Sequence, residues 1–152
     1  MSANLEPALC SGLVMCEKVI REGGTGKYTL INCFNNFNTM GFPLQSIPFY
    51  VFVMLTNCKG TFESINVTLR IENPKTGQVF FSSVGNVKLV SGANLQGSEI
   101  LEIPFQVTPF LIPEAGLYLL VVLVDNENIG KRSFTVTALA GGTPQVGQGQ
   151  GG

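Results

Sequence analysis

Alternation of apolar and polar residues is the feature that most constrains how this chain folds. The clearest stretch is ESINVTLRIE at 63–72, where four apolar residues fall on one side: Ile65, Val67, Leu69 and Ile71. A period of two predicts a half-buried β-strand, because successive side chains of a strand point to opposite faces. No stretch shows the 3.6-residue period of an amphipathic helix. The chain is therefore expected to be an all-β protein.

Eight segments of the chain have strand character and are separated by short turns. They lie at 13–22, 28–37, 47–55, 63–72, 78–83, 99–107, 117–125 and 131–139. The segment at 117–125 is apolar on both faces, which predicts a central strand covered on both sides. The segment at 99–107 contains Pro104, which lacks a backbone N–H, so this strand is expected at a sheet edge or at a bulge.

Short strands without helices are typical of two packed sheets or of a closed barrel. Some segments are apolar on one face and others on both faces. Together they favour a single antiparallel two-sheet β-sandwich of about eight strands, immunoglobulin-like or C2-like, with a small barrel as the alternative. A chain of 152 residues is long enough for one such core. Residues 1–140 are assigned to this domain, and the uncharged Gly/Gln-rich stretch at 141–152 is expected to be a flexible tail.

The stretch REGGTGKYTL at 21–30 has the glycines and the lysine of a phosphate-binding loop. That motif requires Gly-x-x-x-x-Gly-Lys followed by Ser or Thr, between a strand and a helix. Here Arg21 takes the place of the first glycine, Tyr28 follows Lys27, and a strand comes next. The stretch is therefore interpreted as a hairpin loop, in which glycine permits positive φ angles.

This hairpin predicts that two cysteines oppose each other. If Glu22 pairs with Lys27, the same register along the ladder sets Cys16 opposite Cys33. Directly opposed Cβ atoms lie about 4.5–5.5 Å apart. The pair is expected to be either two adjacent buried thiols or a redox-sensitive cross-strand disulfide, and a one-residue bulge would separate the two residues.

The chain carries little charge. Charged residues make up 12% of it and the net charge is −1, whereas an ordinary soluble domain has about 25% charged residues. Nine Lys and Arg against ten acids, with no basic run longer than Lys131–Arg132, argue against nucleic-acid binding. A weakly charged surface repels other chains little, so a protein partner or self-association into a homo-oligomer is expected.

No segment is expected to span a membrane, because the longest apolar run, at 117–124, is far shorter than the required ~18 residues. The N-terminal segment has no basic stretch, and Glu6 stands where an export signal would carry Lys or Arg. A cytoplasmic location is therefore expected. Four cysteines would be free thiols there: Cys10, Cys16, Cys33 and Cys58.

The residues that most enzymes and metal sites require are scarce. The chain has no histidine and a single aspartate, Asp125, and its cysteines lack the spacing of a zinc knuckle. No catalytic, cofactor-binding or metal-ligating residue is therefore predicted. The expected function is a non-catalytic binding or assembly module that acts through loops, an edge strand or uncharged faces. The alternative is an enzyme with a Cys, Ser or Glu nucleophile and no histidine.

One segment, FNNFNTMGFP at 34–43, has the character of a binding loop. Asn amides beside aromatic rings could hold a polar ligand or a peptide, and the candidate interaction residues are Asn35, Asn36, Phe37, Asn38 and Phe42. The alternative is a loop whose phenylalanines cap an open end of the core.

Three stretches carry a resemblance to a known family. They are CEKVIREGGTGKYTLINCFNNF at 16–37, FPLQSIPFYVFVMLTN at 42–57 and PEAGLYLLVVLVDNENIGKRSFTV at 113–136. Over residues 8–139 the chain resembles a family of small bacterial all-β proteins of unknown function. The resemblance implies a β-sandwich and no catalytic residues.

Overall fold

The computed structural model describes residues 9–56, 64–88 and 100–139. These ranges contain eleven strands and no helix. One sheet has four strands in the order β2 (Tyr28–Phe34), β1 (Leu9–Arg21), β5 (Phe49–Thr56) and β8 (Leu101–Val107). The other sheet has five, in the order β3 (Asn36–Thr39), β11 (Glu127–Ala138), β10 (Gly116–Val124), β6 (Ser64–Glu72) and β7 (Val79–Lys88).

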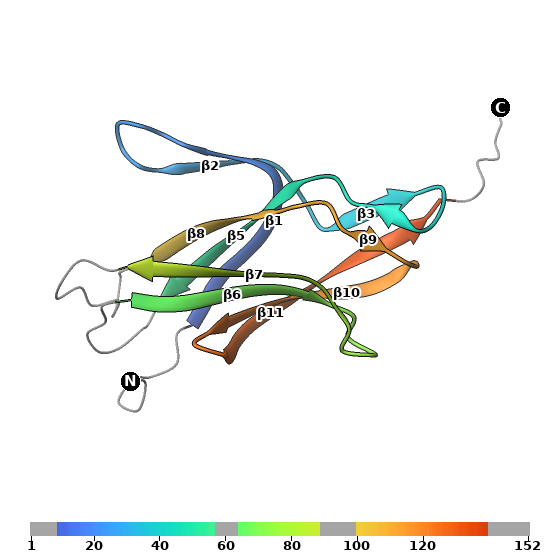
Figure 1. The fold of residues 1–152 in the computed structure, drawn as a ribbon. Coiled ribbons are helices and arrows are strands. Elements are labelled where there is room, and N and C mark those ends of the chain that lie inside the picture. The colour runs from blue at the N-terminus through green and yellow to red at the C-terminus, as the bar shows by residue number, and fades with distance from the viewer. Residues whose placement is uncertain (1–8, 57–63, 89–99, 140–152) are drawn as a thin grey trace.

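Two separate sheets packed face to face confirm the predicted sandwich over the barrel alternative (Figure 1). All eight predicted strands are present, but the strand predicted at 28–37 ends at Phe34, and its last two residues belong to β3 in the other sheet. Two further short strands were not predicted: β4 (Leu44–Gln45) and β9 (Leu111–Ile112). Strands β4 and β9 pair with each other in a small ladder of their own. The predicted tail at 141–152 lies outside the described residues.

The prediction that the sandwich is wholly antiparallel is wrong at one place, since β3 pairs with β11 in parallel. The reason lies in the chain path. Strand β2 is an edge strand of the four-stranded sheet. After Asn35 the chain crosses to the other sheet, where β3 is the edge strand. Because no hairpin links β3 to β11, nothing in the connection requires the two strands to run in opposite directions.

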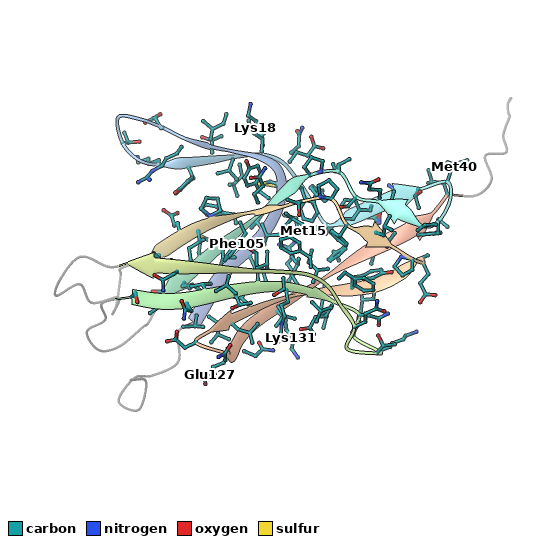
Figure 2. All side chains as sticks on the ribbon, viewed as in Figure 1. Met15, Lys18, Met40, Phe105, Glu127 and Lys131 are labelled. Atoms are coloured by element: carbon teal, nitrogen blue, oxygen red, sulfur yellow. The ribbon has the colours of Figure 1, made fainter. Side chains whose placement is uncertain are left out.

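The core is built from the inner faces of both sheets. On β6 the four apolar residues of the alternating pattern are all buried, and on β5 the buried inner residues include Phe49 and Val51. Figure 2 shows Met15 within the molecule, whereas Lys18 and Met40 lie at its periphery. The Tyr118 ring is also buried, and its hydroxyl donates a 2.7 Å hydrogen bond to the Glu114 carbonyl. Immunoglobulin-like sandwiches use a comparable tyrosine corner.

Two predictions about individual strands are confirmed. Strand β10 lies between β11 and β6, and Val121 on its outer face is buried although it faces away from the core. Lys131 and Arg70 flank Val121 in register, and such side chains can cover apolar surface with their aliphatic stems. Strand β8, which contains Pro104, is the edge strand of the four-stranded sheet.

The glycine-rich stretch forms the predicted hairpin loop. The Glu22 amide donates to the Lys27 carbonyl at 2.7 Å, and the Gly26 amide donates to the Glu22 carbonyl at 2.8 Å. Gly26 has a φ of 73°, which glycine adopts without steric cost. The hairpin projects from the sandwich (Figure 1), and the Tyr28 ring packs edge-on against Phe52 with centroids 5.1 Å apart.

Candidate functional site

The segment predicted to be an interaction loop contains a strand. Asn36–Thr39 form β3, so the loop assignment is corrected for Asn36, Phe37 and Asn38. Asparagine is uncommon in strands, because its side chain competes for backbone hydrogen bonds. Here the amide of Asn36 instead donates to the hydroxyls of Thr135 and Thr137 on β11, at 2.9 and 3.0 Å. These contacts hold β3 against its neighbour.

Phe37 anchors β3 from the opposite face. Its ring packs edge-on against three others, with centroid separations of 5.2 Å to Phe34, 5.5 Å to Phe49 and 5.9 Å to Phe134. Edge-to-face packing at these separations is favourable beyond the burial of area alone. The alternative interpretation of the segment, in which phenylalanines cap the core, therefore describes Phe37 well.

A pocket of about 360 Å³ lies beside β3. Its wall is contributed by β1, β2, β3 and the segment that contains β4. The lining residues are Glu17, Phe34, Asn36, Phe37, Asn38, Leu44, Gln45, Ser46 and Ile47. The β2–β3 crossing brings the first five together, and the return of the chain through β4 supplies the other four.

The predicted interaction residues divide into two groups. Asn36, Phe37 and Asn38 line the pocket, whereas Asn35 and Phe42 do not. Asn35 is an exposed residue between β2 and β3, and Phe42 packs against the hydrophobic core. The other lining residues were not predicted: Phe34 begins the predicted segment, 44–47 follow it directly and Glu17 comes from β1, and no local sequence pattern marks them as parts of one pocket.

Most of the side chains that line the pocket are apolar or carry an amide. Among the described residues of the lining, Glu17 is the one ionisable side chain, and its carboxylate accepts a 3.1 Å hydrogen bond from the amide of Asn32. Ser46 is only 3% exposed. Its hydroxyl accepts the Phe110 amide at 3.0 Å, and its own amide donates to the Phe110 carbonyl at 2.9 Å. Ser46 thus fixes the β4 segment to the segment that precedes β9.

Some backbone groups of β3 face away from its partner strand β11. The carbonyls of Asn35 and Thr39 accept hydrogen bonds from Thr135 and Leu139. Because alternate residues of a strand direct their backbone groups to opposite sides, the N–H and C=O groups of Asn36 and Asn38 point away from β11. Within the described ranges these groups have no backbone partner, since β3 is the last strand of its sheet.

The predicted thiol pair lies next to this site. Cys16 on β1 is directly opposite Cys33 on β2, and both are free cysteines. Cys16 is buried as expected, but Cys33 is exposed, so the expectation of two buried thiols is wrong for Cys33. Burial raises the pKa of the Cys16 thiol, and the neighbouring Cys33 raises it further. The adjacent residues Glu17 and Phe34 line the pocket.

Among residues 9–56, 64–88 and 100–139, no cluster of three His, Cys, Asp or Glu side chains could hold a metal ion. The prediction that the protein uses no metal or cofactor stays a prediction. In the same part of the chain, no helix is long and apolar enough to cross a membrane.

Comparisons with known proteins give one family and a larger set of solved structures, two of which show how low the similarity is. The profile of a family of unknown function, DUF6941, matches residues 11–137. No curated protein matches the chain. An immunoglobulin-like protein from Pseudomonas aeruginosa is 18% identical, with a TM-score of 0.39, over 87% of this chain and 98% of that one. The alkylpurine DNA glycosylase AlkC of Pseudomonas fluorescens, bound to DNA containing an abasic site analogue, is 16% identical with a TM-score of 0.41. That match covers 68% of this chain, which spans only 28% of the glycosylase.

Proposed function

The chain belongs to the DUF6941 family of unknown function, and we propose that it is a non-catalytic module that binds a protein partner through the pocket between β3 and β4. The observation that carries this proposal is the composition of the lining. Among the described residues, apolar side chains and amides line the pocket around a single carboxylate, that of Glu17. Two of the lining residues, Asn36 and Asn38, also have backbone groups that face away from β11. Such a lining offers contact area and hydrogen bonds but only one group that could transfer a proton.

The surroundings of the pocket favour a protein over a small metabolite. Three large apolar side chains are exposed on the segments around it: Met40 after β3, Ile47 after β4 and Leu111 on β9, which pairs with β4. A macromolecular partner could cover all three together with the pocket, whereas a small molecule would leave them in water. The low charge of the chain also favours this, because neutral polar groups cost less to desolvate than charged ones.

The enzyme alternative has weaker support. Among the candidate nucleophiles of the pocket, Ser46 is buried and its hydroxyl already accepts the Phe110 amide. Of the nearby thiols, only Cys33 is exposed. A titration with thiol-reactive and serine-reactive probes separates the two functions, because one hyper-reactive residue at neutral pH would favour an enzyme. A cytoplasmic location is proposed with the binding function.

The test is to capture the partner from native cells with the protein and to identify it by mass spectrometry. Two variants are compared, which replace side chains of similar solvent exposure inside and outside the pocket. Ile47, which is 50% exposed and lines the pocket, is replaced in Ile47→Glu. Val79, which is 43% exposed and lies at the start of β7, is replaced in the control Val79→Glu. We expect a partner that wild type and Val79→Glu retain in equal amounts and Ile47→Glu loses. Equal retention by all three would contradict the proposed site.

A further inference from the structure

We propose that the ligand of this pocket is an extended segment of a partner protein, which adds as a strand to the open edge of β3 and places a basic residue beside Glu17. This inference rests on the proposed function and deepens it. It specifies the backbone contacts and the charge of the ligand, neither of which follows from binding alone.

The first step concerns the edge of β3. The backbone N–H and C=O groups of Asn36 and Asn38 point away from β11, as the hydrogen bonds of Asn35 and Thr39 to that strand require. An edge of this kind is a template for another strand. The edge strand β8 carries Pro104, which removes a donor, but β3 contains no Pro and no charged residue over Asn36–Thr39. The β3 edge is therefore unprotected in sequence.

The second step concerns the opposite wall. Leu44 and Gln45 pair with Ile112 and Leu111, and the Ser46 amide donates to the Phe110 carbonyl. In an antiparallel ladder this places Gln45 at a non-hydrogen-bonded position, so its N–H and C=O point away from β9. Gln45 lines the pocket together with Asn36 and Asn38. A segment between the two walls could therefore bond to both.

The third step is a comparison of size. Strand β3 has four residues, and at about 3.3 Å per residue it spans about 13 Å. The pocket volume of about 360 Å³ is near the lower end of the range for ligand sites, about 300–1,000 Å³. A short extended segment of a few residues suits both quantities. Main-chain bonds would provide most of its affinity, and side-chain contacts would provide its specificity.

The fourth step concerns charge. Glu17 is exposed and is the only ionisable residue in the lining, and the Asn32 amide holds its carboxylate from the neighbouring strand. A Lys or Arg side chain of the ligand would pair with this carboxylate, whereas an acidic residue there would be repelled. The ligand is thus recognised through its backbone, which bonds to β3, and through one positively charged side chain, which pairs with the Glu17 carboxylate.

The experiment uses the full chain labelled with ¹⁵N and a capped seven-residue probe peptide of alternating threonine and valine with lysine at its centre. We expect saturable shifts of the Asn36 and Asn38 amide resonances at millimolar peptide. A version of the peptide that is N-methylated at alternate residues should bind about tenfold more weakly, because it cannot complete the ladder. Absence of saturable shifts up to about 10 mM peptide, or equal binding of the methylated peptide, would overturn the proposal.

Variants of the chain test the two contacts separately. Asn38→Pro removes the outward N–H and should weaken binding about tenfold, whereas Asn38→Ala keeps that N–H and should stay within about twofold of wild type. Glu17→Gln should weaken binding about fivefold, and a peptide with norleucine for lysine should lose no further affinity on this variant. Glu127→Gln, at the far end of β11, serves as the charge-matched control and should bind as wild type (Figure 2).

The two proposals fail in different ways. If Ile47→Glu loses the native partner but Asn38→Pro and Asn38→Ala both retain it, the pocket binds a protein and strand addition is wrong. If Ile47→Glu retains the partner, the proposed function itself is wrong. Circular dichroism of each variant establishes that it is folded before its binding is compared.

Discussion

Cys16 on β1 lies directly opposite Cys33 on β2, with the first thiol buried and the second exposed. This is the register that pairing of Glu22 with Lys27 predicts. The hydrogen bond from the Glu22 amide to the Lys27 carbonyl closes the hairpin, and the ladder continues without a shift from Arg21–Tyr28 to Met15–Phe34. Two thiols in one ladder position therefore differ in solvent access.

The first prediction is a difference in reactivity between these thiols. Iodoacetamide should alkylate Cys33 in the folded protein, whereas Cys16 should react only after denaturation, because it is 0% exposed and its raised pKa disfavours the thiolate. Peptide mapping by mass spectrometry measures both sites. Protein made in the cytosol should have the mass of the fully reduced chain. A deficit of about 2 Da mapped to this pair would instead indicate the cross-strand disulfide.

The second prediction is a loss of stability at alkaline pH. Burial raises the pKa of Cys16 above its usual 9.0, and burial raises the pKa of Tyr118 above its usual 10.0. Both groups then keep their protons longer in the folded chain than in the unfolded chain. The stability that they contribute is complete below the unfolded pKa values and is lost as pH rises through the folded ones.

Urea denaturation from about pH 7 to about pH 11 measures this loss. The unfolding midpoint of wild type should fall above pH 9.0, the usual pKa of a cysteine thiol. Cys16→Ala should show a smaller fall, and Tyr118→Phe a smaller fall at the highest pH. Identical pH profiles for wild type and both variants would mean that these two groups do not couple ionisation to folding.

The third prediction concerns Phe37, which anchors the edge strand β3. Phe37→Ala should lower the free energy of unfolding by about 3–5 kcal/mol, because it removes a buried ring that contacts three others. Met40→Ala, at a residue 63% exposed just after the same strand, should change it by less than about 0.5 kcal/mol. Similar losses for the two variants would show that the aromatic cluster does not stabilise the fold.

Much of this fold could be predicted from periodicity and turn chemistry. The apolar residues of 63–72 alternate because β6 has one buried face, and the glycine-rich stretch at 21–30 contains the loop that fixes the hairpin register. Pro104 indicated an edge strand because a residue without an N–H is poorly suited to the middle of a sheet. Each of these signals is local to one segment, so the sequence carries it directly.

The site could be predicted only in part. Asn36–Thr39 is too short to show a period of two, and its asparagines favour a turn on propensity. The strand forms because Phe37 is buried and the Asn36 amide reaches two threonines about a hundred residues along the chain. Glu17 joins the pocket through the crossing between sheets, and Gln45 joins it through the return of the chain in β4. No local pattern specifies such a tertiary arrangement.

The fourth prediction is self-association through the first hairpin or a neighbouring face. The chain carries only 12% charged residues, so there is little repulsion between copies. Asn32 and Asn35 are both exposed in this region. Asn35→Lys is the better variant, because Asn32 has a φ of 55°, which disfavours lysine, and its amide bonds to Glu17. Gel filtration with light scattering should give wild type a mass of at least twice 16.3 kDa at micromolar concentration.

Asn35→Lys should shift that mass toward the monomer, because a buried lysine without a partner opposes association. The control is Asn128→Lys, which adds the same charge at the opposite end of β11 from β3 and should leave the mass unchanged. The edge strand β7, which has no charged residue before Lys88 at its end and has Val84 exposed, is the competing surface. Dissociation by Val84→Lys but not by Asn35→Lys would place the contact at β7. A monomeric mass for wild type up to about millimolar concentration would contradict self-association, since stable homodimers form well below that range.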